Sequence, residues 1–403
     1  MTLRATVNRI LDYCARPVMH WSSFLVCGAV GLTVAVAVGA GLTVRLGLSL
    51  WIFGVAVATA VATFLSLALL TKVLAGEERL VYYHHEVAIL ASVTTVLWLI
   101  GQPVLRYLDV TLLGVGAFLV CGRVGCFMVG CCHGRPHDWG VRYRPEHADV
   151  GFTPYFVGVR LFPVQLAESA WVFLTVAVGV GLLLRGAAPG EALAWYIVVY
   201  DLGRFGFEFL RGDPARPYRL GFSEAQCTSL LLMVILSAAE LAGAVPLRPW
   251  HLLATLSLIA VMIGVIAKRR WLGDRRYRLL GARHMREVAG AVELIASLDG
   301  RATRQGGSQP RTMPVARTSS GIRISGGRMD DADGREIRHY TISSTVGDLR
   351  DGEASALTEL LARLNHHDTH GEALRGGTPG TFHLIVASPS PLDTGRARAP
   401  DAG

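Results

Sequence analysis

The amino-acid sequence predicts an all-α polytopic membrane protein, with about seven or eight transmembrane helices and a small soluble α+β module after them. Three observations carry this prediction. The 403-residue chain is 51% hydrophobic and only 17% charged, whereas soluble domains average about 25% charged residues. Several uncharged stretches approach the roughly 20 residues that cross a bilayer. A composition rich in Gly, Ser, Pro and Arg replaces them near residue 299.

The uncharged stretches locate the expected spans. If the stretch 191–210 is included despite its ionisable residues, about eight candidates satisfy the length requirement. They are residues 21–44, 46–71, 87–105, 110–122, 169–184, 191–210, 225–239 and 252–267. The first apolar run follows twenty fairly polar residues and lacks a clear small-residue cleavage site. We therefore expect a first span there and no cleavable signal peptide.

Composition divides the chain into four regions. Residues 1–20 form a juxtamembrane segment, 21–268 the membrane domain, 269–320 a basic anchor with a flexible linker, and 321–403 the soluble module with a disordered tail. In the module, "GIRISGG" and "IRHYTISS" alternate like strands, "SALTELLARLNHH" has helical spacing, and "TFHLIVAS" resembles a buried strand. The polar group of His366, His367, Asp368 and His370 is interpreted as a loop after the helix, because no second ligand group accompanies it.

The net charge of +8 favours contact with lipids over contact with nucleic acid. Basic residues flank the spans, as in "KRRWLGDRRYR" at the end of the membrane domain. At such positions they face anionic lipid head groups. We therefore expect membrane lipids as partners and no nucleic acid.

Arginines inside predicted spans are the first sign of a functional site. A charge in hydrocarbon is costly, so such a residue normally faces protein or a water-filled cavity. Arg123 ends one apolar span, and Arg204, Glu208 and Arg211 follow at i, i+4 and i+7, on one face of a helix. An ion-pair ladder is one interpretation. The other is a net positive site at membrane depth, which would bind a phosphate.

The stretch "CGRVGCFMVGCCHGR" surrounds Arg123 with glycines and cysteines. Gly125 and Gly130 allow a close backbone approach, either to a ligand or to another helix. For Cys126, Cys131 and Cys132, packing or a local disulfide is favoured over a catalytic thiol, because adjacent cysteines make a poor tetrahedral pair. No metal and no other cofactor is expected.

His84 and His85, with Glu86 beside them, begin the third predicted span. A single histidine at such a place is usually an interfacial side chain. Two histidines with an adjacent carboxylate also suit proton transfer, because imidazole titrates near neutral pH. Both interpretations stay open.

Together these motifs resemble the prolipoprotein diacylglyceryl transferase family. "GRVGCFMVGCCHG" is similar to the family signature GRxGNFxNGExxG, and closer to variant members with GCFxxGCCxG. "YYHHEVA", "FPVQLAES" and "LGRFGFEFLRGDP" follow the family's order of motifs. The resemblance covers roughly residues 20–245, and the C-terminal module is foreign to the family.

The resemblance implies a multi-pass enzyme of the bacterial inner membrane, active in lipoprotein biosynthesis. It would move the diacylglyceryl group of phosphatidylglycerol to the cysteine thiol of a lipoprotein precursor's signal peptide. Arg123 and Arg204 would contact the lipid phosphate, and His84 or His85 would be the catalytic base. The remaining residues expected to bind substrate are Gly125, Cys126, Gly130, Gln165, Glu168, Glu208 and Arg211.

The sequence also departs from the family pattern. Cys126 stands where the family has Asn, Cys131 where it has Glu, and Phe162 and Ala167 where it has His and Tyr. Two alternatives therefore stay open: a catalytically degenerate membrane scaffold whose module recruits a partner, and a membrane thiol oxidoreductase using the three cysteines.

The order of motifs predicts an active face outside the cytoplasm, whereas the basic anchor favours the opposite side. One of the stretches 225–245 and 250–267 is expected not to span fully, so that the tail is cytoplasmic.

Overall fold

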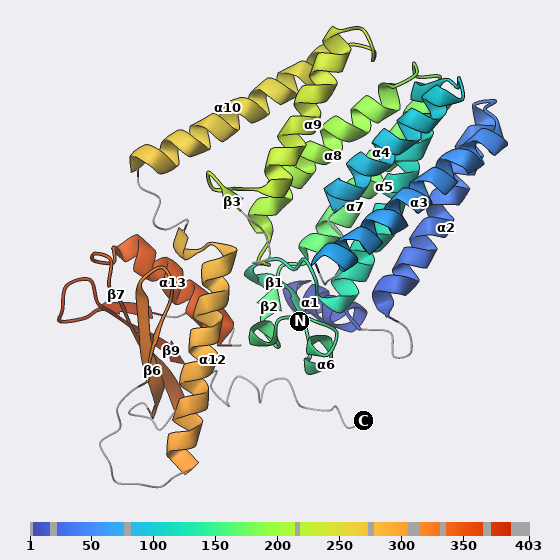
Figure 1. Ribbon diagram of the computed structural model, residues 1–403. Coiled ribbons are helices and arrows are strands. Elements are labelled where there is room, and N and C mark those ends of the chain that lie inside the picture. Colours follow the sequence, from blue (N-terminus) through green and yellow to red (C-terminus); the bar gives the residue numbers. More distant parts are fainter. Residues whose placement is uncertain are drawn as a thin grey trace.

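The computed structural model describes most of the chain. The described residues are 3–16, 22–75, 82–213, 218–272, 278–304, 314–330, 336–365 and 372–387. The histidine-rich group at 366–370 and the tail after 387 lie outside them. Among the described residues, a helical bundle and a smaller α+β module can be distinguished (Figure 1).

The bundle consists of long helices that alternate in direction (Figure 1). They are α2 (Ser23–Arg45), α3 (Leu50–Ala75), α4 (Tyr82–Leu99), α5 (Val104–Val129), α7 (Val164–Leu184), α8 (Glu191–Phe207), α9 (Glu224–Leu241) and α10 (Pro249–Leu272). Within the described residues, six of these are long and apolar enough to cross a membrane; α4 and α8 are not among the six. The fold class is thus confirmed: a multi-pass helical protein with a small C-terminal sheet.

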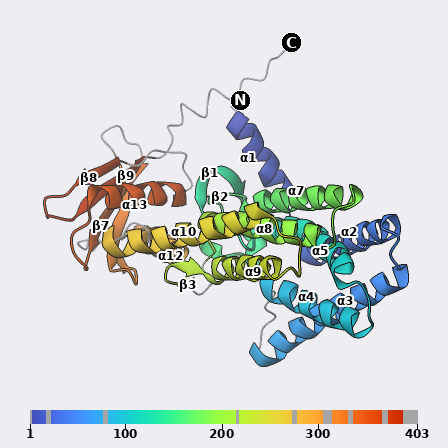
Figure 2. The same ribbon diagram turned by 90° about the horizontal axis from the view of Figure 1, so that it is seen from above.

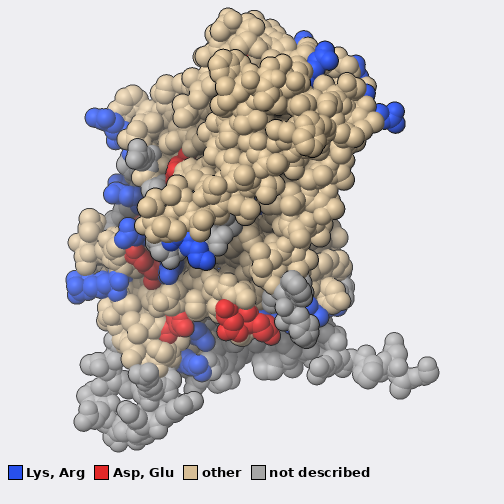
Figure 3. All heavy atoms as spheres, turned by 45° about the vertical axis from the view of Figure 1, so that its right-hand side comes forward, with Lys and Arg blue, Asp and Glu red and all other residues tan. Residues whose placement is uncertain are grey.

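The outer surface of the bundle is apolar. Large hydrophobic side chains such as Leu25, Leu65, Leu69 and Trp98 are exposed there. Figure 3 shows a broad face over the bundle on which almost no Lys, Arg, Asp or Glu appears. In a soluble protein such a large apolar patch would promote aggregation, whereas on a membrane protein it can contact the acyl chains of lipids. Helix α5 is the most buried of the six apolar helices, and it forms the centre of the bundle.

Glycines bring α2 and α5 close together. A Cβ atom on Gly125 would lie 2.9 Å from Cβ of Cys27, and one on Gly31 would lie 3.0 Å from Cβ of Cys121. Small residues at a contact allow two membrane helices to approach at backbone distance. Gly125 therefore packs against α2, and its expected contact with substrate stays a prediction.

Buried charges join neighbouring helices. Asp109 on α5 accepts hydrogen bonds from the backbone N–H groups of Gly190 and Leu193, both at 2.7 Å, and so caps the N-terminus of α8. The carboxylate of Glu240 on α9 hydrogen-bonds to Nδ1 of His251 on α10. Both α9 and α10 are long and apolar enough to span. The expectation that one of them falls short is not supported, because this buried pair and their apolar length make them an antiparallel hairpin.

A compact lobe lies between α5 and α7 at one end of the bundle. It contains β1 (Pro136–Arg142), α6 (Pro145–Ala148), the 3-10 turn η1 (Pro154–Phe156) and β2 (Arg160–Leu161), and β1 pairs antiparallel with β2. Helix α1 (Leu3–Cys14) packs along β1. Asn8 donates to the carbonyl of Asp138 at 3.1 Å and accepts from the N–H of Gly140 at 2.9 Å.

The C-terminal module has a five-stranded antiparallel sheet of order β5-β6-β7-β9-β8. Its elements are α12 (Ala282–Arg304), β5 (Val315–Arg317), β6 (Ile322–Asp330), β7 (Glu336–Ser344), α13 (Asp351–Leu364), β8 (Glu372–Arg375) and β9 (Phe382–Ala387). The predicted strands at β6, β7 and β9 and the predicted helix at α13 are present.

The expected flexible linker is wrong over part of its length. Helix α12 and strand β5 occupy much of 269–320, so the module begins at Ala282. Apolar residues at 285, 288, 289, 292 and 295 make the buried face of α12. This helical spacing was obscured by the Gly- and Arg-rich run that follows it.

The module packs on the lobe. Buried residues of both belong to one hydrophobic core, including Phe156 and Val159 of the lobe and Val288 and Ile295 of α12. Arg363 on α13 donates to the carbonyl of Pro136 at 3.2 Å. The two views agree that the module lies beside β1 and β2 (Figures 1 and 2). The lobe and the module therefore lie on the same side of the membrane.

Candidate functional site

Two arginines from separate helices meet at one carboxylate in the bundle. Nη2 of Arg123 on α5 lies 2.9 Å from Oε1 of Glu168 on α7, and Nε of Arg204 on α8 lies 3.6 Å from the same oxygen. All three side chains are buried. The structure thus brings together residues that are 81 positions apart, from Arg123 to Arg204.

The face expected from Arg204, Glu208 and Arg211 is only partly formed. Nη1 of Arg204 lies 2.7 Å from Oε2 of Glu208. Helix α8 ends at Phe207, the chain tightens into the 3-10 turn η2 (Glu208–Leu210), and Arg211 is extended. The continuous helical ladder is therefore wrong. Arg211 instead makes a two-bond contact with Asp213, from Nε and Nη2, at 2.8 and 2.9 Å.

These contacts change the expected charge of the site. Each buried arginine has a carboxylate beside it: Glu168 serves Arg123 and Arg204, Glu208 serves Arg204, and Asp213 serves Arg211. The three guanidinium groups face three carboxylates, so the expectation of a net positive site is wrong. Buried ions need such partners because leaving one unpaired costs several kcal/mol, on the order of 3–5.

The site still has unused hydrogen-bonding capacity. Within the described part of the chain, Nε of Arg123, Nη1 of Arg211 and Oε1 of Gln165 are buried without a hydrogen-bond partner. A guanidinium has five N–H donors, and one carboxylate uses at most two of them. A buried donor without a partner is uncommon. The two free guanidinium donors are therefore available to an anion.

The two adjacent histidines lie on α4 but in different surroundings. His84 is about half exposed, and its Nε2 lies 2.8 Å from Oε1 of Glu224. His85 and Glu86 are buried, and the His85 ring lies 4.7 Å from that of Phe64. Glu86, Glu168 and the two arginines all act electrostatically on the Tyr200 hydroxyl, which connects α4 to the arginine site. Of the two histidines, His85 faces the interior.

A second polar cluster was not expected from the sequence. The hydroxyl of Tyr83 on α4 donates to Oδ1 of Asp201 on α8 at 2.8 Å and lies 2.5 Å from Oγ of Ser229 on α9. Asp201 was visible as an ionisable residue in a span, but nothing in the sequence paired it with Tyr83 or Ser229. These contacts fix the start of α4 against α8.

The cysteine-bearing turn follows directly after α5. Gly130, with φ +80°, ends the helix in the left-handed region, and a Cβ atom there would meet the Phe152 ring at 2.7 Å. Gly130 therefore terminates the helix, and its expected contact with substrate stays a prediction. Nε2 of Gln165 donates to the carbonyl of Cys131 at 2.8 Å, so Gln165 holds the turn in place.

The three thiols lie close together at this turn. All seven cysteines of the chain are free, so no local disulfide is formed. Hydrogen bonds from the Cys126 and Cys131 thiols, with the positive charges of Arg211 and Arg123, hold the pKa of Cys132 well below its usual range. Burial lowers the pKa of the neighbouring His133. The cysteine cluster therefore lies within electrostatic reach of the arginine site.

A cavity of about 730 Å³ lies elsewhere, in the C-terminal module. It lies between α12 and the sheet, beside Arg317 and Arg323. It has no residue in common with the arginine site.

Comparison with known proteins gives the same picture for the membrane domain. Residues 85–241 match the family described as prolipoprotein diacylglyceryl transferase, so the resemblance noted in the motifs is confirmed there. The matches do not favour a scaffold or a thiol oxidoreductase. No solved structure matches the chain significantly.

Three relatives illustrate the extent of the similarity. The phosphatidylglycerol–prolipoprotein diacylglyceryl transferase of Clostridium tetani is 31% identical over 132 residues, which is 33% of this chain and 51% of the relative. The second such enzyme of Clostridium perfringens is 31% identical, over 32% of this chain and 49% of its own length. That of Streptomyces coelicolor is 29% identical, over 33% and 41%. The chain thus spans about half the length of the curated relatives it matches.

Proposed function

Because residues 85–241 match the prolipoprotein diacylglyceryl transferase family, we propose that this chain is a diacylglyceryl transferase of the bacterial plasma membrane. Its lipid substrate is phosphatidylglycerol. Its acceptor is the cysteine thiol in the signal peptide of a lipoprotein precursor. The observation that carries the proposal is the convergence of Arg123 and Arg204 on Glu168 inside the membrane domain.

The chemistry is an alkyl transfer to sulfur. The acceptor thiol loses its proton, and the thiolate attacks the terminal glyceryl carbon that bears the phosphate. A carbon–sulfur bond forms, the carbon–oxygen bond to phosphate breaks, and glycerol phosphate leaves with the electron pair. His85, buried on α4, takes the thiol proton. The guanidinium groups of Arg123 and Arg204 stabilise the charge that develops on the leaving phosphate.

A nearly neutral site can bind an anionic head group through its free donors. Nε of Arg123 and Nη1 of Arg211 are buried and have no hydrogen-bond partner in the described part of the chain. Glu168 holds the arginines in position before lipid arrives, because it is the carboxylate that Arg123 and Arg204 share. Charge-assisted hydrogen bonds to phosphate then exceed what a neutral donor could give.

The test is transfer of labelled diacylglycerol from phosphatidylglycerol to a precursor peptide by purified protein. We expect Arg123→Gln and Arg204→Gln each to lower the rate by about 10²-fold or more, as for other removed oxyanion donors. Arg185→Gln is the matched control, because Arg185 is exposed at the far end of α7. A folded Arg123→Gln variant that transfers lipid at the wild-type rate would refute the proposal.

A further inference from the structure

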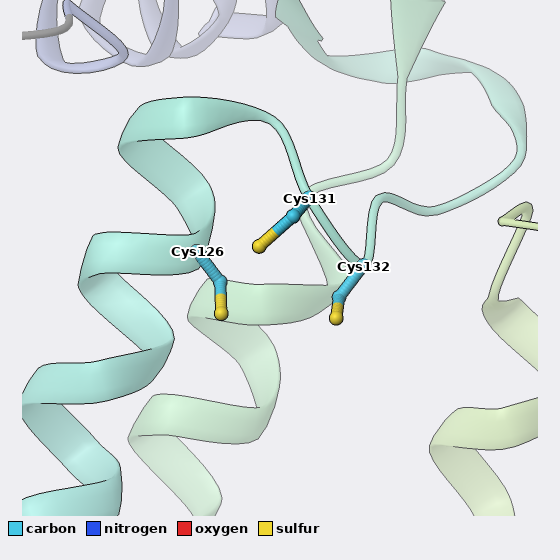
Figure 4. A group of neighbouring side chains, drawn as sticks. All are labelled: Cys126, Cys131 and Cys132. Carbon is cyan, nitrogen blue, oxygen red and sulfur yellow. The ribbon is translucent and has the colours of Figure 1, made fainter. Parts of the chain in front are cut away.

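The sulfur atoms of Cys126, Cys131 and Cys132 face one another. Figure 4 shows the three side chains directed toward a common space, one from the last turn of α5 and two from the loop after it. All three Sγ atoms lie within 4.8 Å of one another. Tetrahedral zinc thiolates, with Zn–S of about 2.3 Å, place their sulfurs about 3.8 Å apart. Two sulfurs at the upper limit of 4.8 Å would have to approach each other by about 1 Å to reach that spacing.

The backbone is shaped to produce this arrangement. Side chains of adjacent residues normally point apart, so Cys131 and Cys132 would not be expected to share a target. Cys132 has φ +55°, in the left-handed region that residues with a Cβ atom seldom adopt. Gly130 ends α5 just before it, and Gln165 holds the Cys131 carbonyl at 2.8 Å. Such strained positions cluster at ligand sites.

Simpler explanations account for less. A disulfide needs two sulfurs about 2.05 Å apart and would leave the third thiol unused. Apolar packing would place these thiols among hydrocarbon side chains, whereas here they face one another and Cys131 is exposed.

We propose that Cys126, Cys131 and Cys132 bind a zinc ion as three thiolates and leave its fourth coordination position open for the acceptor's cysteine thiol. Among the residues that the structure describes, the group close enough to share an ion contains these three cysteines and no His, Asp or Glu. Three protein ligands with one open position are typical of catalytic zinc. The exposed side of the cluster, at Cys131, gives access to that position.

The assignment of the fourth ligand rests on the proposed function, whereas the assignment of the ion does not. A cysteine thiol is the acceptor in the proposed reaction, and zinc prefers sulfur and nitrogen ligands. The arginine site and the cysteine cluster share Arg123 and Arg211 in their electrostatic surroundings. A bound acceptor sulfur would therefore lie near the lipid head group.

The first experiment measures metal content and cobalt substitution in the full chain, purified in detergent under reducing conditions without chelator. We expect about one zinc per chain, and after exchange the sulfur-to-cobalt charge-transfer and tetrahedral bands of a thiolate site. Cys126→Ser and Cys132→Ser should abolish both signals, and Cys227→Ser, an exposed cysteine outside the cluster, should keep both. Wild-type protein without zinc or cobalt thiolate bands, or with copper in place of zinc, would overturn the proposal.

The second experiment adds acceptor peptides to the cobalt form. A peptide with cysteine should change the cobalt spectrum, and the same peptide with serine should not. Equal responses to both peptides would refute the open coordination position for the acceptor thiol. The assignment of the zinc ion to the three cysteines would still stand. A cysteine-dependent change in protein that transfers no lipid would instead refute the proposed function and leave the metal site standing.

Discussion

Glu168 is the residue that holds together the two arginines that we propose bind the lipid phosphate. Its Oε1 lies within ion-pair distance of both Arg123 and Arg204. Glu168→Gln removes the shared negative charge, so that Arg123 loses its carboxylate and Arg204 keeps only Glu208. Without lipid we expect a loss of about 3–5 kcal/mol in the free energy of unfolding. Phosphatidylglycerol should restore much of this loss, because its phosphate replaces the carboxylate.

The measurement is the apparent melting temperature of Glu168→Gln with and without phosphatidylglycerol in the detergent. Glu146→Gln is the control, since Glu146 is exposed on α6. If the lipid stabilises Glu168→Gln no more than it stabilises the control, the phosphate does not bind at these arginines.

The two adjacent histidines should differ in their effect on activity. His85 is buried, whereas His84 is half exposed and pairs with Glu224. If His85 accepts the thiol proton, His85→Asn should lower the transfer rate by about 10²–10⁴-fold. His84→Asn should stay within a few-fold of wild type, by comparison with other surface substitutions. Equal losses in both variants, measured in the same transfer assay, would assign them a common structural role.

Residue types and order located much of this site from the sequence. Arg123, Arg204 and Glu168 stood out because ionisable groups are rare inside apolar spans. Their mutual contacts and the contact between Tyr83, Asp201 and Ser229 depend on helix packing, which spacing along one chain does not encode. The three cysteines stood out as a cluster, but the sequence did not indicate that adjacent Cys131 and Cys132 would face one common space, an arrangement that accompanies a positive φ at Cys132.

At the scale of elements, α1 stabilises the lobe that carries the cysteine turn. Asn8 makes two hydrogen bonds to the backbone of β1. Asn8→Ala would leave the buried N–H of Gly140 without this partner, at a cost of about 1–3 kcal/mol, whereas the carbonyl of Asp138 still accepts from Arg4. We expect faster amide hydrogen exchange in β1, with no such change for Arg9→Ala, whose side chain is exposed on the same helix. Unchanged exchange in Asn8→Ala would show that α1 does not support β1.

The start of α12 should be sensitive to acid. His284 is buried, its Nδ1 lies 2.6 Å from the carbonyl of Leu279 and its Nε2 2.8 Å from the Thr318 hydroxyl. Burial lowers its pKa below 6.5. Above 6.5 both folded and unfolded chains hold it neutral. As the pH falls below 6.5, the unfolded chain takes up the proton first, so stability is lost until the lowered folded pKa is reached.

Hydrogen exchange of α12 and β5 as a function of pH measures this effect. We expect protection to fall below about pH 6.5 in the wild type and in His137→Gln, a control at a partly exposed position on β1. In His284→Gln that pH dependence should shrink. A pH profile that His284→Gln leaves unchanged would assign the acid sensitivity to another group.

Sequence periodicity predicted the elements better than it predicted their boundaries. The apolar stretches correspond to the bundle helices, and alternation indicated β6 and β7. Helix α12 was missed because the Gly- and Arg-rich run that begins at residue 299, within its last turns, resembles a linker, although buried residues 285–295 have helical spacing. Strand β8, of four residues, is too short to produce a periodic signal.

At the scale of the whole molecule, the lobe packs against both the membrane domain and the module. The same core contains Phe127 of α5, Tyr143 of the lobe and Leu361 of α13. Asp138 on β1 lies within ion-pair distance of Arg4 and Arg363, although such exposed pairs contribute little individually, about 0–1 kcal/mol. The apolar core therefore dominates the attachment of the module.

The composition predicted the division between bundle and module, but not that the module would rest on the lobe. That arrangement depends on the apolar surfaces of η1 and α12, which share one core. The contact between the lobe and the module places both on the same side of the membrane.

Binding of phosphatidylglycerol by variants of the two arginines tests the central claim most directly. Native mass spectrometry of the purified protein gives lipid affinity without requiring turnover. Arg123→Gln and Arg204→Gln should each weaken the binding of phosphatidylglycerol by about 10–100-fold, as expected for loss of hydrogen bonds to a charged group. Both variants should leave the binding of diacylglycerol unchanged. Arg185→Gln should bind both as the wild type does. Unchanged phosphatidylglycerol affinity in either folded variant would contradict the account.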